Sequence, residues 1–511
     1  MSDSEYQELL RLREERAATL AENQQLKSLI EQLSKTNEEL RELLKDLQAK
    51  LDVLIVQQKK RNRRDYGKKT EKYNPRPAVV EAHNDTTRKP GNNEARIEQI
   101  RGLPPEDVFH RVADEDRSCP DCQVEKIELG QDVSYQLERL AGTIKRLRHV
   151  QEILVCPKCR SKISVASKPE PPFPKATVAS GLLSHVIVSK YADFSTLYRL
   201  ERIYAREGAP IPRSTLADWI LAASLTLEPL YNLLVAQVFN SKVVCTDDTE
   251  VKIQDRRINK NIRKGKMSVY VGDRHFPYSI FDFSPNQSFE RNKAMFATFK
   301  GFVQADAAPG FDAIFEDGAR IEVGCNAHAR RKYFECQVVA EQKVKPVLDL
   351  YRDIYKIEEA AKRRGAPASE LLHLRQTKSK PLFDSLQKTI LKLQETELPK
   401  SPLSKAVNYS LEHWQALTRF LDDPDLEIDN NISERTVKDF VLCRKNALFV
   451  GSDAGGKAAA ICLSLLVSAK RNGVEPWSYL KDIFTCINGV TTNQLQQFLP
   501  DVWLMSQNKP Q

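Results

Sequence analysis

The chain has 511 residues, of which 41% are hydrophobic and 29% are charged, a balance that fits a soluble folded protein and not a chain without a core. This length exceeds what a single hydrophobic core usually supports, so we expect roughly two to four domains. The net charge of +9 points only weakly to a polyanionic partner, because both signs of charge are abundant.

Neither an export signal nor a membrane span is expected. The first residues are acidic and lack the apolar stretch of a secretory signal. The longest apolar run, residues 458–469, lies between Lys457 and Lys470 and is too short to cross a bilayer. Four of the ten cysteines form two Cys-x-x-Cys pairs, which favours metal binding over disulfides in an intracellular chain. We therefore predict a cytoplasmic protein with no membrane partner.

Residues 1–60 predict a coiled coil. Apolar residues recur in alternating steps of four and three, with neither Gly nor Pro before Gly67. The seam consists of Leu26, Ile30, Leu33, Asn37, Leu40, Leu44, Leu47, Leu51 and Leu54. A buried Asn such as Asn37 lowers stability but selects register and strand number. The uninterrupted seam favours a homo-oligomer over a long helix packed on its own protein.

Residues 61–100 predict a basic segment followed by a linker. The basic run starts at the end of the coiled coil and includes Lys60, Arg61, Arg63 and Arg64. Such a run is either a solvated tail or an arm on a phosphate backbone, and its position favours the second. Residues 73–93 are rich in Pro, Asn, Asp and Thr and lack periodicity, which is typical of a linker.

Residues 101–168 predict a zinc-binding module. Cys119 and Cys122 form one Cys-x-x-Cys pair, and Cys156 and Cys159 form a second after 33 intervening residues. Four thiolates in this pattern can close a tetrahedron on Zn²⁺. With every position filled by protein, the zinc has a structural role. Residues 133–140 and 143–154 have the texture of a hairpin between the pairs.

Residues 175–240 predict a helical DNA-binding region that follows a proline-rich hinge at 169–174. We expect helices over 181–206 and 214–239, with Ser214 as the N-cap of the second. A helix-turn-helix and ordinary helix packing are both compatible with this pattern.

From residue 241 the pattern changes to strands. The expected strands span residues 243–249, 267–272, 278–283, 301–306 and 321–325. A helix beginning near Asn326 follows the last of them. These elements predict an α/β sheet. We assign the catalytic core to 241–336 and 426–470, an all-helical insertion to 337–425, and a C-terminal helical extension to 471–511.

Glu434 lies at the start of a helix within the second part of that core. Asn430, Asn431 and Ser433 are competing caps for this helix. Taken alone, a carboxylate beside Arg435 is most simply a solvated charge.

Two aspartates change that interpretation of Glu434. Asp247 and Asp306 each end an expected strand, where an open α/β sheet places its functional groups. Two such carboxylates and Glu434 can hold two divalent cations, and Mg²⁺ suits the site because it needs few carboxylates. Asp248 is the alternative to Asp247 as the first ligand. We prefer Asp247 by the motif, since neighbouring strand residues point to opposite faces and only one of the two can face the site.

Basic residues near these acids are candidates to contact DNA phosphate. They are Arg330, Arg331, Arg435, Arg444 and Lys445, together with the basic run after the coiled coil. The sequence of residues 451–458 is similar to a phosphate-binding loop, but Ala458 occupies the position where that loop needs Ser or Thr. We therefore expect this loop to turn the chain or to touch DNA phosphate through its backbone amides.

With these motifs the chain resembles the IS66 family of insertion-sequence transposases, within the DDE (RNase H-like) transposases, over nearly its whole length. The motifs that carry the resemblance are the coiled coil, the paired Cys-x-x-Cys module, Asp247-Asp248-Thr249, Gln304-Ala305-Asp306, Ala327-His328-Ala329-Arg330-Arg331-Lys332, Asn430-Asn431 with Glu434-Arg435, and Arg444-Lys445-Asn446 with the glycine-rich residues 451–456. Glu250 departs from a common Pro, and Asn326 from a common Trp.

The resemblance implies a multidomain transposase with an RNase H-like core and the triad Asp247, Asp306 and Glu434. Such an enzyme cuts the ends of its element and joins them to target DNA with Mg²⁺ or Mn²⁺, and helper proteins from the same element are compatible with it. Two alternatives remain open: a catalytically inactive, zinc-containing DNA-binding protein, and an RNase H-like nuclease that cuts without joining.

Overall fold

A computed structural model of the chain describes residues 3–66, 144, 153–155, 163–165, 170–255, 261–288, 290–306, 314–316 and 318–507. The four cysteines of the predicted zinc module and most of the linker lie outside these ranges. Side chains from residue 60 to the end of the first helix are also outside the description, which includes the predicted phosphate contacts Lys60, Arg61, Arg63 and Arg64.

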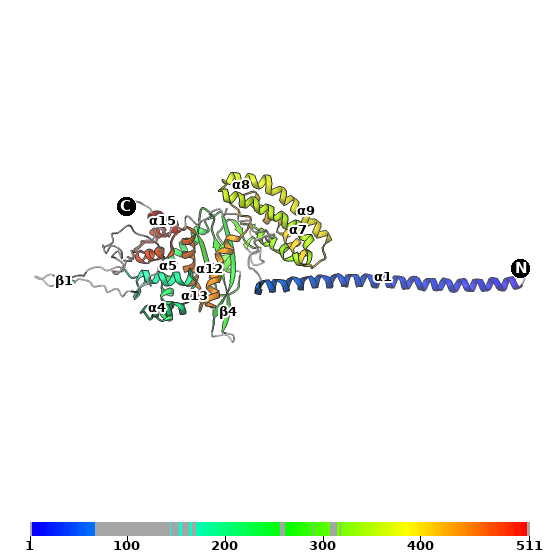
Figure 1. Cartoon of the computed structure of the whole chain (residues 1–511), viewed down its shortest axis with the longest axis horizontal. Helices are drawn as coiled ribbons and strands as arrows, with labels where there is room; N and C mark the ends of the chain where they lie inside the picture. The colour runs from blue at the N-terminus through cyan, green and yellow to red at the C-terminus, as the bar shows by residue number, and fades with distance from the viewer. Residues whose placement is uncertain are drawn as a thin grey trace, which may run out of the picture. The chain divides into compact units, whose positions relative to one another are not determined.

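The predicted coiled-coil segment is one long helix, α1 (Asp3–Tyr66; Figure 1). Its seam side chains are exposed in the single chain, with relative exposures of 50–65% from Leu26 to Leu54. Ala49 and Val56 are buried. A regular stripe of solvent-exposed leucines along one side of a helix is typical of a helix that pairs with another helix.

Two short strands flank the second Cys-x-x-Cys pair in the sequence. Strand β1 (Ile153–Val155) pairs antiparallel with β2 (Ile163–Val165). The hairpin expected from residues 133–140 and 143–154 lies almost wholly outside the described residues, so that prediction remains untested.

Three helices occupy residues 180–238, where the sequence predicted two. They are α3 (Ser180–Tyr191), α4 (Leu197–Arg206) and α5 (Arg213–Val238). The chain turns between α3 and α4, where Phe194 has a left-handed φ of 59°, and the Thr196 side chain caps α4 by accepting the N–H of Arg199. The Ser214 cap is wrong, because α5 begins one residue earlier with Pro212 at its N-cap.

Helix α5 is long and apolar enough, by length and composition, to cross a membrane. One side of α5 packs in the core, where Leu216, Leu227, Leu230 and Leu234 are completely buried, whereas Leu225 is exposed. A core helix passes the same test, so α5 is most simply explained by the fold of the protein.

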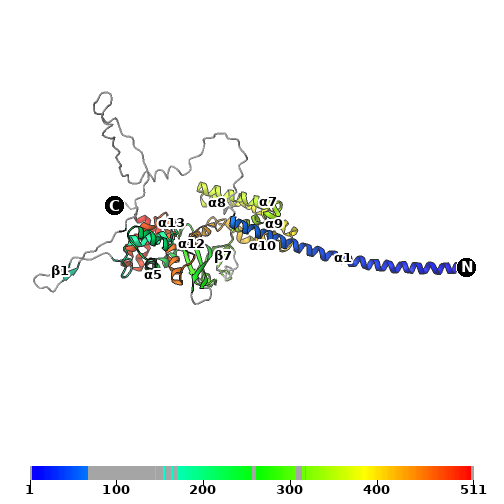
Figure 2. The same cartoon turned by 60° about the horizontal axis from the view of Figure 1, so that its bottom comes forward.

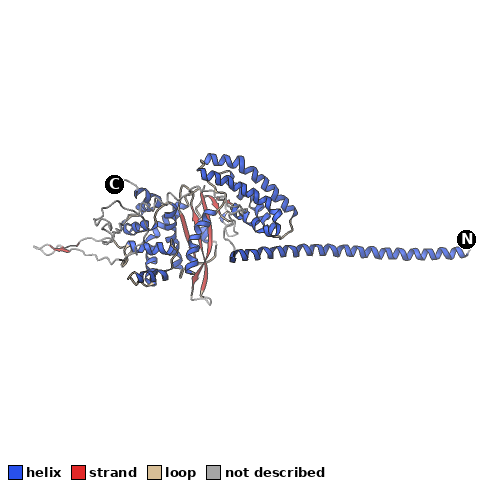
Figure 3. Ribbon diagram, in the orientation of Figure 1, coloured by secondary structure: helices blue, strands red, loops and turns tan. Residues whose placement is uncertain are grey.

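The central sheet has five strands in the order β5-β4-β3-β6-β7. Its strands are drawn red in Figure 3, among the helices that cover them. Pairing is antiparallel for β3–β4 and β4–β5, and parallel for β3–β6 and β6–β7. The strand bounds are β3 (Val243–Gln254), β4 (Ile262–Val271), β5 (Ser279–Ser284), β6 (Gly301–Gln304) and β7 (Arg320–Val323), with α6 (Glu290–Met295) before β6. The sheet confirms the α/β class predicted for this region.

Strand β3 is longer than the sequence predicted. Asp247 and Asp248 lie in its middle, not at its end, because β3 and β4 continue as a two-stranded ladder to Gln254. The parallel pairing of β3 with β6 stops at Cys245, two residues before Asp247. Asp247 therefore lies just beyond the part of β3 that is paired in parallel with β6.

The free edge of β5 is closed by helix α13 (Asp453–Arg471). Ser464 and Ser468 accept the backbone N–H groups of Phe281 and Ser279 at 2.8 and 3.0 Å. Gly456 packs on the ring of Phe283, where a Cβ would come within 2.5 Å. Packing therefore explains Gly456 in the first turn of α13, and Ser452 caps that helix by accepting the N–H of Gly455.

The segment after β7 is helical. It comprises α7 (Asn326–Arg364), α8 (Ala368–Leu374), a π turn (Arg375–Ser379), α9 (Lys380–Thr396), α10 (Pro402–Glu412), α11 (Trp414–Thr418) and a 3₁₀ turn (Arg419–Leu421). Helices α7, α9 and α10 pack together (Figure 2). The buried Arg375 bonds to both Glu358 oxygens and to the carbonyls of Phe420 and Asp423, which ties the end of this segment back to the helices.

Helix α12 (Asn431–Ala447) returns the chain to the sheet and contacts β3 and β4 (Figure 1). The chain then runs through α13, α14 (Pro476–Cys486), two 3₁₀ turns (Ile487–Gly489 and Thr492–Phe498) and α15 (Pro500–Gln507). The helical extension expected after residue 470 is therefore helical in the structure.

Candidate active site

Asp247 lies in β3, and Asp306 lies two residues beyond the end of the neighbouring parallel strand β6, which is shorter than the expected strand 301–306. The pairing of β3 with β6 places Cys245 opposite Gln304. Asp247 lies on the same face of β3 as Cys245, because side chains alternate along a strand, and Asp306 follows Gln304 by two residues. The Cys245 thiol lies 3.6 Å from the Gln304 side-chain oxygen on that face. The charge of Asp306 is among the causes that raise the pKa of Asp247, which indicates that the two carboxylates lie near each other.

Asp248 forms an ion pair with a residue on β4. Its carboxylate lies 2.9 Å from the ammonium group of Lys266 on β4. The Oδ1 atom of Asp247 accepts the backbone N–H of Asp248 at 2.8 Å. The two acids thus have distinct surroundings, and Asp247 is the one on the side of Asp306.

The electrostatics of Asp247 reflect crowding of negative charge. Burial first, and then the charges of Asp306, Glu434 and Asp248, raise the pKa of Asp247 to about 7, against the backbone hydrogen bond that lowers it. Both other members of the predicted triad therefore lie close enough to act on Asp247. A carboxylate held among others in this way is stabilised by a cation.

Glu434 is brought to the sheet by the first turn of α12. The Asn430 side-chain N–H donates to the backbone carbonyl of Thr246 at 2.8 Å, and the Ser433 hydroxyl lies 3.4 Å from the same oxygen. Asn430 occupies the N-cap position without making a side-chain cap bond. The N-cap is therefore one of the three residues expected there, but the buried side-chain amide of Asn430 bonds to β3 and not to the helix start. Asp429 instead accepts the N–H of Asn431 at 3.1 Å.

The segment that leads into α12 is held by residues at the ends of β6 and β7. The Gln304 side-chain amide donates to the carbonyl of Glu427 at 2.8 Å, and the Asn326 amide donates to the carbonyl of Ile428 at 3.1 Å. The N–H of Asn430 points at the sulfur of Cys325, 3.2 Å away. Asn326, a departure from the Trp common in the family, is thus a buried anchor here.

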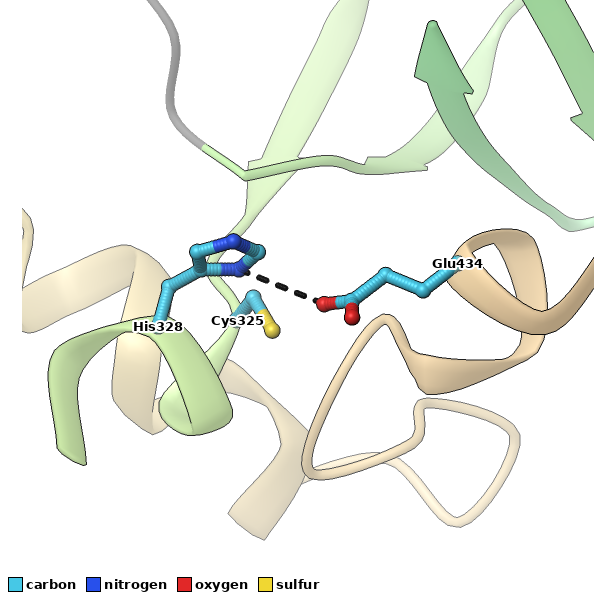
Figure 4. A group of neighbouring side chains, drawn as sticks. All are labelled: Cys325, His328 and Glu434. Carbon is cyan, nitrogen blue, oxygen red and sulfur yellow. Dashed lines mark ion pairs between the residues drawn. The ribbon is translucent and has the colours of Figure 1, made fainter. Parts of the chain in front are cut away.

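Glu434 has two basic neighbours. Its Oε1 lies 3.6 Å from His328 Nδ1, and its Oε2 lies 3.9 Å from Arg331 Nη2. Cys325, His328 and Glu434 offer three donor atoms that all lie within 4.8 Å of one another (Figure 4). Within the described part of the chain, this group is the one that meets that spacing, and the two aspartates are not in it.

The other predicted phosphate contacts are spread around the site. Arg331 reaches Glu434, and Arg330 stacks over the ring of Phe334 with 5.9 Å to its centroid. Arg435 is exposed and lines a cavity of about 300 Å³ with Asp439 and Lys470, among others. Arg444 donates to the backbone carbonyl of Glu250. Lys445 is exposed near the end of α12.

Several residues of this site were missed by the sequence reasoning. Gln304, Asn326 and Asn430 act through buried hydrogen bonds to distant backbone carbonyls, for which a single sequence has no local signal. Cys325 and His328 do have a local sequence signal, because a cysteine and a histidine stand three residues apart at the start of a helix.

Family sequence models match most of the chain. The model described as "Transposase IS66 family" matches residues 175–458, which cover the sheet, the helical insertion and α12. The "IS66 C-terminal element" matches residues 464–500. The "zinc-finger binding domain of transposase IS66" matches residues 116–160, which include all four cysteines of the predicted module.

Three similar proteins come from Sinorhizobium fredii (strain NBRC 101917 / NGR234), and each is named only as an uncharacterized protein. The protein y4jD is 29% identical over 423 residues, which cover 79% of this chain and 81% of that one. The protein y4hP is 28% identical over 434 residues, covering 80% and 78%. The protein y4qI is 30% identical over 338 residues, covering 62% and 61%. Since the family's own sequence model spans more than half of the chain, and its two accessory elements match on either side, this protein belongs to the IS66 family of transposases.

Proposed function

We propose that the chain is a DNA transposase of an insertion sequence, which cleaves DNA at the ends of its element and joins those ends to target DNA. The proposed catalytic residues are Asp247, Asp306 and Glu434, on an RNase H-like core. The observation that carries the proposal is the anchoring of α12 on the carbonyl of Thr246, the residue before Asp247, because it supports a position of Glu434 near Asp247.

The donor set fits Mg²⁺ or Mn²⁺. Three carboxylates offer oxygen ligands, which hard divalent cations prefer. The pKa of Asp247 is raised by burial and by its acidic neighbours, and the Oε1 atom of Glu434 is buried without a hydrogen-bond partner. Both features are relieved by a bound cation. When bound, two such ions supply activation of the attacking oxygen and neutralisation of the leaving oxygen.

The protein itself positions the helix that carries Glu434 and supplies basic side chains that neutralise phosphate charge. Gln304, Asn326 and Asn430 hold the start of α12 in register with the sheet. Arg331 lies beside Glu434, and Arg435 lines a cavity with residues of α12 and α13. Both suit phosphate oxygens, with Arg330, Arg444 and Lys445 as further contacts. The ion pair with Lys266 keeps Asp248 on the other face of β3.

Accessory regions fit DNA binding and assembly. Cys119, Cys122, Cys156 and Cys159 hold a structural Zn²⁺. Helix α4 presents three exposed arginines on one face, Arg199, Arg202 and Arg206, which suit a DNA backbone. The exposed seam of α1 pairs with the same helix of a second copy, so the protein is a homo-oligomer. The protein acts in the bacterial cytoplasm on nucleoid DNA, and helper proteins from the same element are compatible with this role.

The deciding experiment is a strand-transfer assay with Mg²⁺, the DNA ends of the element and a supercoiled target. Wild-type protein should give joined products, and Asp306→Asn should give none. Cleavage without joining would favour the nuclease alternative. DNA binding with neither reaction, and equal behaviour of Asp306→Asn, would favour the inactive DNA-binding alternative.

A further inference from the structure

Cys325, His328 and Glu434 form a mixed group of donors that the proposed magnesium chemistry does not use. A thiol sulfur, an imidazole nitrogen and a carboxylate oxygen come within 4.8 Å of one another at the junction of β7, α7 and α12 (Figure 4). Mg²⁺ has little affinity for sulfur and nitrogen, whereas Zn²⁺ takes all three donor types in tetrahedral sites. The composition of the group therefore indicates a different ion.

Two atoms of the group are buried without hydrogen-bond partners. They are His328 Nδ1 and Glu434 Oε1, which face each other across 3.6 Å. This separation is too long for a hydrogen bond. Buried polar atoms almost always have a partner, so a pair of unpartnered atoms aimed at one point calls for an occupant between them.

The surroundings of Cys325 suit a thiolate ligand. Cys325 is the N-cap residue of α7, where the helix N-terminus favours negative charge. The N–H of Asn430 points at its sulfur from 3.2 Å. Without a metal, burial holds the pKa of the Cys325 thiol at about 12, so an incoming cation has to displace the proton to solvent.

The group is also open to solvent on one side. Cys325 is completely buried, whereas the side chains of His328 and Glu434 are 23% and 20% exposed. The group therefore lies close to the surface on the side of these two residues, although their donor atoms Nδ1 and Oε1 are themselves buried. With three protein ligands, a tetrahedral ion keeps one position for water.

We propose that Cys325, His328 and Glu434 form a second zinc site, separate from the Cys-x-x-Cys module. Zn²⁺ bound there occupies Glu434, so it competes with the catalytic cations for that carboxylate and holds the enzyme inactive. The competition rests on the proposed function, but the binding of Zn²⁺ does not.

The test measures metal on the full chain without DNA or Mg²⁺. Protein is saturated with Zn²⁺, dialysed against metal-free buffer, and its zinc content per chain is measured by mass spectrometry. His328→Gln should hold one equivalent less than wild type, and so should Cys325→Ser. Because His328 is partly exposed, its replacement preserves the fold and decides the outcome. Equal zinc in wild type and His328→Gln overturns the proposal.

Cys336→Ser is the matched control for the thiol. Cys336 is another buried cysteine of α7, and its sulfur donates to the carbonyl of Lys332 at 3.2 Å. With Co²⁺ in place of Zn²⁺, the sulfur-to-cobalt absorption should fall in Cys325→Ser and stay unchanged in Cys336→Ser. The same fall in both variants would show that Cys325 is not a ligand. A failed strand-transfer assay would leave these binding results unaffected, so the two proposals fail separately.

Discussion

The side-chain amide of Asn430 donates a 2.8 Å hydrogen bond to the backbone carbonyl of Thr246, the residue that precedes Asp247. Asn430 is completely buried, and it is the residue from which α12 begins. One hydrogen bond therefore sets the position of Glu434 against the strand of the first aspartate.

Replacing Asn430 tests this coupling. Asn430→Ala leaves the Thr246 carbonyl short of a donor, which costs about 1–3 kcal/mol in the free energy of unfolding. Loss of a residue that orients a ligand also lowers activity, by roughly 10–100-fold. Urea unfolding and strand transfer measure the two effects. Asn431→Ala, at a half-buried neighbour, is the control and should change both much less.

Asp247 and its neighbour Asp248 offer a matched pair. Asp247→Asn should reduce strand transfer by more than about 100-fold, since it removes a proposed ligand and not only an orienting group. Asp248→Asn should retain most activity, because Asp248 pairs with Lys266. Comparable losses in both variants would contradict the assignment of Asp247 as the first ligand.

Mg²⁺ binding should depend on pH through Asp247. Its pKa is raised to about 7, so the carboxylate is largely protonated below that pH and Mg²⁺ binds more weakly there. Stabilisation of the protein by Mg²⁺, followed as the shift in thermal unfolding temperature, should grow as the pH rises through this pKa. Asp247→Asn should flatten this dependence.

The same group has the opposite effect on the metal-free protein. The unfolded pKa of an Asp is about 3.9, so the native state binds more protons than the unfolded state between roughly pH 4 and 7. The contribution of Asp247 to the free energy of unfolding therefore falls as the pH rises through that window. The free energy of unfolding, measured against pH in a chelating buffer for the wild type and for Asp247→Asn, gives this contribution.

The α1 seam predicts self-association. Leu40→Asp combined with Leu47→Asp puts two charges on the seam and should convert the oligomer to a monomer, as measured by light scattering after size exclusion. Arg41→Asp with Gln48→Asp has the same spacing one residue off the seam and should preserve the oligomer. A wild-type monomer at micromolar concentration would contradict the prediction.

The arginines of α4 predict salt-dependent DNA binding. Replacing Arg199, Arg202 and Arg206 by Ala should weaken binding and reduce the slope of log affinity against log salt by up to about 0.9 for each phosphate that is no longer neutralised. Fluorescence anisotropy at several salt concentrations gives the slope. An unchanged slope would place the DNA elsewhere.

Local patterns in the sequence were sufficient for several features. The heptad seam, the paired Cys-x-x-Cys spacing and the strand pattern depend on contiguous residues, so the long helix α1 and the α/β class of the sheet were predictable. The acids Asp247, Asp306 and Glu434 could be selected by motif, and their role as ligands remains a prediction. The extent of β3 was not predictable, because its second half is held by the ladder with β4 and not by its own pattern.

The arrangement around Glu434 was decided by the tertiary structure. The bond from Asn430 to Thr246 spans 184 residues, and Gln304 reaches Glu427 across 123. Such contacts depend on the register of the parallel strands and on where the helical insertion returns the chain, neither of which is encoded in a local stretch. For the same reason the sequence showed Cys325 and His328 only as neighbours of each other. The return of α12 to the sheet is what places Glu434 beside them.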